Sequence, residues 1–364
     1  MKGAIRRKLI EASLGATMAL VCLTTTTYAW FAKNANAWVD EFKVDIRQDE
    51  GLLISVDGKN WYDSIYGSNA HSSNSIYKAI VAKRLNKAYD DVTYSDLYPD
   101  ENASEEAKSA ARLRLSSVST KDLKTFTTVD SKSTVEDETV NGVTTSHYVP
   151  REIEANEFEY VSFDLYFKAE VATYNAYSKY KLTFTPSNLD NTERGVSKVT
   201  SSSTYHTLYN DLTYKNAAGE VMNLHPGDHL YTNTANAMRI GILHSDNETA
   251  TIYEPNIGYS SYALSGNQND IYNPSYNPML TYFNSSHNSE LKPLDDLDVY
   301  KNTQKDFEAG ISFGTFEPQQ DGEYNILKIT VFLWLEGYDG DYLPTTNSDY
   351  VYSFLNFTKI GLEE

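Results

Sequence analysis

Segments in which apolar and polar residues alternate recur along this chain and restrict the folds open to it. The clearest covers residues 158–167, "FEYVSFDLYF". A period of two places alternate side chains on one face of a β-strand. The residues expected to face the core are Glu159, Val161, Phe163, Leu165 and Phe167. Such alternation predicts strands with one buried face, as in packed antiparallel sheets.

Other segments with strand patterns are spread over the whole chain. They lie at residues 42–47, 52–56, 179–186, 235–245, 250–256, 324–337 and 350–360. The segment at 324–337 is apolar at almost every position from Ile329 to Leu335, which indicates a central strand covered on both faces. We therefore predict a mainly β protein, an antiparallel β-sandwich.

Two stretches interrupt the strand pattern with helical spacing and suggest a small insertion at about 75–115. Residues 75–92 carry apolar side chains at helical intervals. Residues 100–115 are a second helix candidate, with Asn102 as its potential cap and Glu105 three positions later. Residues 116–150 and 254–310 are expected to be long loops. Within the first, Asn141-Gly142 lies between two Val/Thr runs, which predicts an exposed hairpin, with a mobile loop as the alternative.

Charge and cysteine content exclude several classes of function. The net charge is −19, and a field of that sign repels nucleic-acid phosphates. The chain has one cysteine, Cys22, so the remainder has no disulfide and no thiolate chemistry. We expect no nucleic-acid partner and no cysteine-based zinc site.

Residues 1–37 resemble an export leader. Lys2, Arg6, Arg7 and Lys8 precede an apolar run that ends in Ala35-Asn36-Ala37, which fits the A-x-A pattern of signal peptidase. Cleavage after Ala37 is the first prediction. An uncleaved N-terminal anchor is the alternative, and Glu11 near the start of the apolar run leaves a prepilin-type leader as a third. The expected location is extracellular or at the cell surface, with membrane contact only through the leader.

The stretch directly after the predicted cleavage point reads as a strand. Phe42, Val44 and Ile46 alternate with charged residues, and Trp38 precedes them. A strand at a newly formed chain end can complete the sheet of another molecule. Trp38, Phe42, Val44 and Ile46 are therefore the expected assembly strand.

Residues with potential binding or catalytic chemistry are few. In "HPGDH", His225 and His229 flank Asp228, but Pro226-Gly227 rules out a regular helix and favours a turn that enters a strand. The acidic string of Glu336, Asp339 and Asp341, and a second one at Asp295, Asp296 and Asp298, are weak candidates for structural calcium. H-E-x-x-H, G-x-S-x-G, P-loop and dinucleotide motifs are absent. We expect no enzyme activity and, apart from that calcium, no cofactor.

Several of these segments together resemble a known family. The leader ending in "TYAWF", the strand "FKVDI" and the segments "LLISVDGKNW", "VSFDLYFKAE", "NAMRIGIL", "IYEPN" and "ITVFLWLEGYDGD" are similar to exported surface proteins of Bacillota related to the TasA/camelysin biofilm-matrix proteins. The resemblance implies a jelly-roll-like β-sandwich whose monomers join into fibres by donating a strand.

The expected function is therefore a secreted structural subunit of an extracellular matrix or surface fibre that self-associates. The alternative is a surface adhesin that binds glycans or other surface proteins through tyrosine-rich loops, with Tyr259, Tyr262 and Tyr272 as contact residues. A pilin-like filament held by an uncleaved N-terminal helix is a further alternative.

Overall fold

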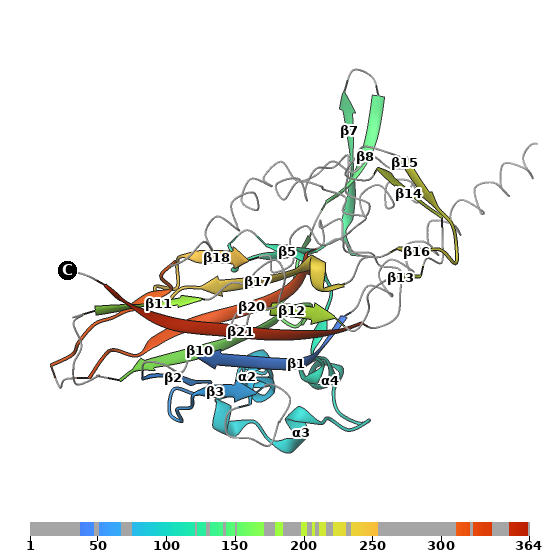
Figure 1. The fold of residues 1–364 in the computed structure, drawn as a ribbon. Coiled ribbons are helices and arrows are strands. Elements are labelled where there is room, and N and C mark those ends of the chain that lie inside the picture. Colours follow the sequence, from blue (N-terminus) through green and yellow to red (C-terminus); the bar gives the residue numbers. More distant parts are fainter. Residues whose placement is uncertain are drawn as a thin grey trace, which may run out of the picture.

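The fold is seen in a computed structural model (Figure 1). It describes residues 37–46, 51–66, 75–120, 122–128, 132–140, 143–149, 151–170, 179–184, 198–201, 206–207, 211–215, 221–230, 234–253, 311–320, 323–336 and 349–362. The loop expected at 254–310 and all but the last residue of the predicted leader lie outside these residues. Among the helices described, none has both the length and the hydrophobicity needed to cross a bilayer.

Two sheets form a sandwich, which confirms the predicted mainly β fold. Sheet A runs in the order β19 (Gly314–Phe316), β11 (Lys179–Phe184), β21 (Asp349–Leu362), β1 (Ala37–Ile46) and β3 (Ser64–Tyr66), with β12 (Lys198–Ser201) also paired to β21 and β4 (Arg114–Leu115) to β1. Sheet B contains β18 (Ala250–Tyr253), β17 (Met238–Leu243), β20 (Leu327–Glu336), β10 (Val161–Ala169), β2 (Leu52–Ser55), β5 (Ser117–Thr120), β6 (Phe126–Thr128) and β9 (Arg151–Glu152).

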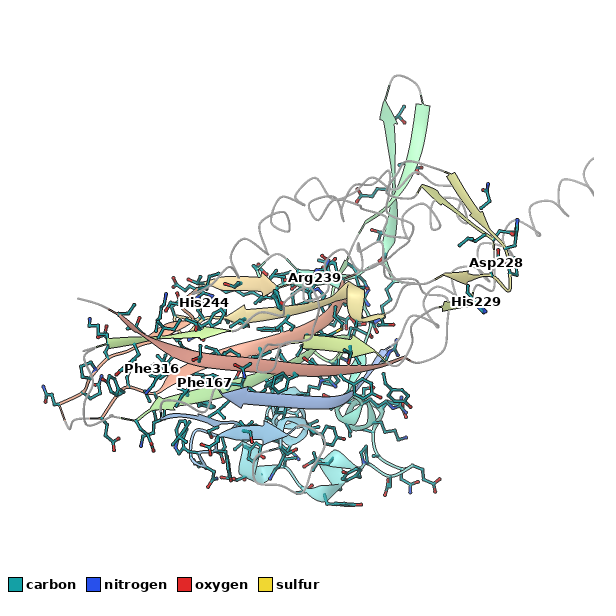
Figure 2. The ribbon with its side chains drawn as sticks, viewed as in Figure 1. Phe167, Asp228, His229, Arg239, His244 and Phe316 are labelled. Carbon is teal, nitrogen blue, oxygen red and sulfur yellow. The ribbon has the colours of Figure 1, made fainter. Side chains whose placement is uncertain are left out.

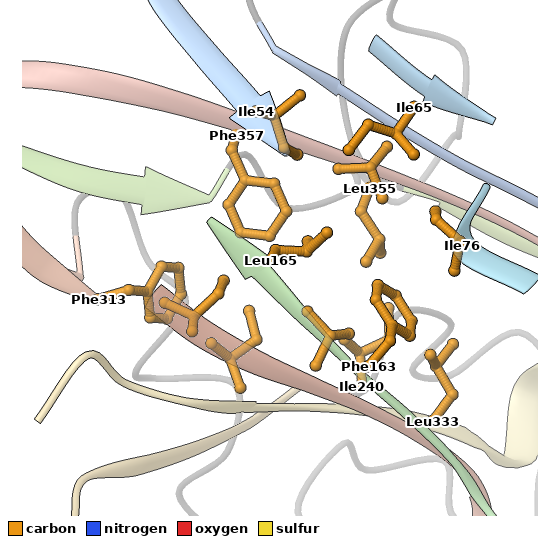
Figure 3. Packing of buried hydrophobic residues seen from close by; sticks show 14 of the residues in the cluster. Ile54, Ile65, Ile76, Phe163, Leu165, Ile240, Phe313, Leu333, Leu355 and Phe357 are labelled. Atoms are coloured by element: carbon orange, nitrogen blue, oxygen red, sulfur yellow. The ribbon is translucent and has the colours of Figure 1, made fainter. Parts of the chain in front are cut away.

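The main core fills the space between the two sheets. In β10, Val161, Phe163, Leu165 and Phe167 are fully buried, as their spacing predicts. Figure 3 shows Phe163 and Leu165 close to residues of sheet A such as Leu355. Burying a large apolar side chain stabilises a fold by roughly 1.5–3 kcal/mol, so this layer is a main source of stability.

A second apolar cluster lies on the face of β17, β18 and β20 that points away from the main core. The hairpin of β5 and β6 places Leu123 and Phe126 against Trp334 of β20. A Cβ atom at Gly241 of β17 would collide with Leu123 and approach Trp334, so glycine permits this close packing. Because β20 has core on both faces, its sequence is apolar at consecutive positions, and its predicted central place is confirmed.

The helical insertion consists of three short α-helices and one 3₁₀-helix beside β2 and β3 (Figure 1). They are α2 (Ile76–Arg84), η1 (Tyr89–Asp91), α3 (Tyr94–Leu97) and α4 (Glu105–Ala111). The cap of α4 is Ser104, whose side chain accepts a hydrogen bond from the backbone of Ala107, so the prediction of Asn102 as the cap is wrong. Asn102 instead belongs to the turn before it, where its backbone amide donates to Asp100.

The long loop expected at 116–150 is instead a series of strands. It contains β5, β6, β7 (Thr134–Val140) and β8 (Val143–Val149), and β7 and β8 form a hairpin across Asn141-Gly142. The hairpin predicted at Asn141-Gly142 is therefore present, and the alternative of a mobile loop is wrong. Three smaller elements complete the described chain: the pairs β13 (His206–Thr207) with β16 (His229–Leu230) and β14 (Leu212–Lys215) with β15 (Val221–Leu224), and the 3₁₀-helix η2 (Thr234–Ala237).

Candidate assembly site

The predicted assembly strand is β1, and in this structure it completes the sheet of its own chain. β1 lies inside sheet A, paired with β21 on one side and with β3 and β4 on the other. Among the described strands of sheet A, every other pair is antiparallel, whereas β1 and β21 run parallel. We call the position of β1 between these strands the slot: β21 forms one wall, β3 and β4 form the other, and both walls form hydrogen bonds with β1.

The register of β1 in the slot is continuous except at one place. Trp38 lies opposite Tyr350, and Ile46 lies opposite Phe357, with an irregularity between Val39 and Glu41. Such a bulge bends a strand and changes the pairing by one residue. Because of the bulge, the residues of β1 before Asp40 and those after it pair with β21 in two different registers. If β1 were shifted along β21, the bulge would no longer lie at the position where the register changes.

Val44 is the residue of β1 with the best-defined packing. It pairs with Leu355 of β21 and Ile65 of β3, and all three side chains are fully buried. Figure 3 shows Leu355 beside Ile65 in the core, with Ile76 of α2 nearby. Phe42 and Ile46 are in register with Ser353 and Phe357. A strand inserted into this slot thus contributes to the core as well as to the ladder.

The helical insertion builds part of the slot wall. The guanidinium of Arg84 in α2 donates to the carbonyl oxygens of Ala110 at 3.2 Å, Arg112 at 2.5 Å and Tyr160 at 2.7 Å. Burial lowers the pKa of Arg84 to about 10, which leaves it charged at neutral pH. Ala110 lies in α4 and Arg112 lies two residues before β4, so Arg84 fixes the segment that leads into the strand paired with the start of β1.

Tyr77 and Glu159 also bind residues near β4. The hydroxyl of Tyr77 donates to the carbonyl oxygens of Leu97 at 2.6 Å and Ala111 at 2.9 Å. Burial raises the pKa of Tyr77 to about 12, so the hydroxyl remains a donor. Glu159, predicted to face the core, is partly exposed and instead accepts a hydrogen bond from Ser116 next to β4. These contacts join residues far apart in sequence, and no local pattern indicated them.

A charged group connects α2 to sheet B. Asp164 of β10 lies 2.7 Å from Lys83 Nζ, 2.6 Å from Lys328 Nζ and 2.8 Å from Thr330 Oγ1. Burial alone would raise the pKa of Asp164, but the charge of Lys83 and the hydrogen bonds from these three residues outweigh it and lower the pKa. A single carboxylate thus anchors the insertion to β10 and β20.

The histidines of "HPGDH" do not converge on a site. His225 Nδ1 lies 2.7 Å from Asp211 Oδ1, and the His225 amide donates to Asp228 Oδ2. His229 begins β16 and pairs with Thr207. The string forms a turn that enters a strand, as predicted, and Figure 2 shows Asp228 and His229 away from the two sheets.

The calcium candidates are divided between two parts of the chain. Glu336 is fully buried at the end of β20, and one of its carboxylate oxygens accepts a hydrogen bond from Trp334 Nε1 at 3.1 Å. Asp339, Asp341 and the Asp295 group lie outside the described residues, as do Ala35 and the tyrosines Tyr259, Tyr262 and Tyr272. Within the residues described, no three potential metal-binding side chains form a group. The calcium site therefore stays a prediction.

An exposed aromatic pair lies on the helical insertion and was not predicted. Tyr94 and Tyr98 are 66% and 45% exposed, and their rings are 4.8 Å apart between centroids. The centroid of the Tyr77 ring lies 6.3 Å from that of the Tyr98 ring. Tyr94 begins α3, and Tyr98 directly follows it. Hydrophobic periodicity could not have predicted this helix, because it has only four residues.

Comparison of the chain with protein-family models, curated proteins and solved structures found no match.

Proposed function

We propose that this protein is a secreted structural subunit of an extracellular matrix or surface fibre, and that β1 joins the subunits. In the assembly, β1 of one copy would occupy the slot between β21 and β3/β4 of the next. The leader and the resemblance to the TasA/camelysin proteins support export and a structural role.

The observation that carries the proposal is the position of β1 in sheet A. No tight turn joins β1 to either of its walls: β1 is followed by β2, which belongs to sheet B, before the chain returns to sheet A as β3. A β1 strand from another copy could therefore form the same ladder with the same register. Exchange of an identical element is a low-cost route to assembly, since the hydrogen bonds and packing that β1 leaves in its own chain are formed again in the neighbouring one.

The start of β1 supports a role at a chain end. The strand begins at Ala37, the residue after which cleavage is predicted. With cleavage there, Trp38 would be the first residue, and β1 could leave its own slot without any preceding chain passing through the sheet.

Electron microscopy of native protein, released without denaturant, tests the proposal first. We expect regular filaments that shorten when a synthetic peptide of residues 37–46 is added in excess, because the peptide would fill terminal slots. A matched peptide with Val44→Asp should have little effect, since a buried, unpaired carboxylate opposes insertion. Monodisperse particles in native samples, or equal effects of both peptides, would reject the proposal.

Deletion of residues 38–47 is a less informative test. Since β1 is paired on both sides and Val44 is in the core, we expect the deletion to destabilise the monomer as well as its assembly.

A surface adhesin is the second candidate, and the Tyr94–Tyr98 pair favours it. Exposed aromatic faces suit the apolar faces of neutral sugars, and the −19 charge disfavours acidic ones. This function predicts that Tyr94→Ala abolishes retention on a neutral glycan array while the fold is unchanged. Retention unaffected by Tyr94→Ala, or none in the wild type, would count against it.

A further inference from the structure

The hairpin of β7 and β8 extends away from the sandwich as an arm (Figure 1). We define the arm as residues 134–149. Its strands pair over seven positions, from Thr134 opposite Val149 to Val140 opposite Val143, and within the described chain they pair only with each other. At about 3.4 Å per residue, the arm has roughly 20 Å of strand edge on each side.

Ion pairs clamp the base of the arm. Lys132 precedes β7 and Arg151 follows β8, and both bind Glu157: Lys132 Nζ lies 2.6 Å and Arg151 Nη1 2.7 Å from its oxygens. Arg151 makes a second bond through Nη2 at 3.0 Å. Burial would raise the pKa of Glu157, but hydrogen bonds from Arg151 and Lys132 lower it to about 2. Glu157 therefore holds the residue before β7 close to the residue after β8, at the point where the arm leaves the sandwich.

The two strands of the arm differ in charge. β7, "TVEDETV", carries three consecutive carboxylates, Glu136, Asp137 and Glu138, and Glu136 and Asp137 are exposed. β8, "VTTSHYV", has no acidic, lysine, arginine, proline or glycine residue and is rich in residues that favour strands. Charged residues on an edge strand prevent pairing with another chain, whereas an uncharged strand of high β-propensity invites it.

We propose that the β8 edge of the arm pairs antiparallel with the β8 edge of a second copy. The resulting four-stranded sheet, in the order β7-β8-β8-β7, places the acidic β7 strands at its outer edges. A second copy is the favoured occupant because a two-fold pairing matches one uncharged edge with itself and keeps the two sets of carboxylates apart. The acidic outer edges then limit the association to a dimer.

This association does not involve β1, so it differs from the strand exchange proposed above. In a fibre it would link two filaments side by side. In a protein that forms no fibre, it would produce a dimer.

The hairpin geometry identifies the backbone amides that would make the contact. In a two-residue hairpin the pair next to the turn, Val140 and Val143, exchanges both hydrogen bonds, and the pattern then alternates. The N–H groups of Thr144, Ser146 and Tyr148 in β8 therefore point away from β7. In β7 the equivalent outward amides belong to Val135, Asp137 and Thr139.

A matched pair of proline variants tests the proposal in the full chain. Ser146→Pro removes an outward amide of β8, and Asp137→Pro removes the outward amide directly opposite in β7, so neither breaks the ladder of the arm. After filaments are removed by centrifugation, analytical ultracentrifugation should show a concentration-dependent dimer for the wild type and Asp137→Pro. Ser146→Pro should weaken dimerisation at least tenfold, and circular dichroism should show both variants folded.

A second variant tests the limiting role of the β7 charges. Replacing Glu136, Asp137 and Glu138 with Thr, Ser and Thr should convert dimers into larger oligomers, since both arm edges then accept strands. A monomeric wild type at all concentrations, or equal loss of dimer in both proline variants, would overturn the proposal. Filaments that persist in Ser146→Pro but no longer associate laterally would support both proposals, and a proline-sensitive dimer without filaments would support only this one.

Discussion

Val44 of β1 lies opposite Leu355 of β21 in a parallel ladder, and both side chains are completely buried. The two residues are separated by almost the whole described chain, yet they meet at the centre of sheet A. Their contact joins the first described strand to the last and couples the position of β1 to the core.

Truncation of Val44 should weaken both the monomer and any assembly that uses the same slot. Val44→Ala removes two buried methyl groups, and we expect a loss of roughly 2 kcal/mol in the free energy of unfolding. Urea denaturation of the monomeric fraction measures this loss. A change below about 0.5 kcal/mol would mean that Val44 is not packed as described.

Removal of Arg84 should loosen the slot wall more than the rest of the sandwich. Arg84→Met leaves the carbonyl oxygens of Ala110, Arg112 and Tyr160 without this donor, and we expect a destabilisation of roughly 3 kcal/mol. Hydrogen exchange should rise most in β4 and β1 and least in β17. The exposed neighbour Arg112 provides the control: Arg112→Met should change neither quantity, and similar exchange profiles for the two variants would refute the role of Arg84.

The contribution of Asp164 to the free energy of unfolding should depend on pH. Its pKa in the fold lies below the ordinary value, so the stabilisation is present above pH ~4 and is lost as the pH falls through the lower, folded pKa. Asp164→Asn should therefore be less stable than the wild type by roughly 2 kcal/mol at pH 7, with a smaller difference near pH 3. Denaturation at both pH values tests this, and a pH-independent difference would contradict it. Asp90→Asn, at an exposed pair with Lys59, should have almost no effect.

Two histidines should contribute to pH dependence with opposite signs. Burial lowers the pKa of His244, whose ring Nε2 lies 2.6 Å from Thr251 Oγ1, so the unfolded chain binds a proton more readily and stability falls below pH ~6.5. A hydrogen bond with Asp211 raises the pKa of His225, so its contribution is present at low pH and lost as the pH rises.

Urea titrations at pH 7 and pH 5 separate the two effects. His244→Gln should reduce the difference in unfolding free energy, pH 7 minus pH 5, and His225→Gln should increase it. Changes of the same sign in both variants would show that the histidine environments are not as described.

The strands with strong apolar–polar patterns could be predicted from the sequence. Contacts and strand pairings between residues far apart in the chain could not. In β10 the alternation correctly indicated four buried residues, but Glu159 broke the pattern because it binds Ser116 beside β4. The apolar run of β20 correctly indicated a central strand, although the β5–β6 hairpin that covers its outer face was expected to be loop. The alternation of β1 indicated a strand, whereas its pairing with β21 could not be inferred from local residues.

The most direct test of strand exchange is a disulfide between β1 and its wall. Lys43 and Phe354 are partners in the β1–β21 register, so the variant Lys43→Cys with Phe354→Cys should form a disulfide on mild oxidation of the assembled protein. If β1 fills the slot of the next copy, a non-reducing gel will show a ladder of covalent multimers that disappears with reductant. A single oxidised monomer band from assembled protein would show that β1 stays in its own chain and would contradict the proposed function.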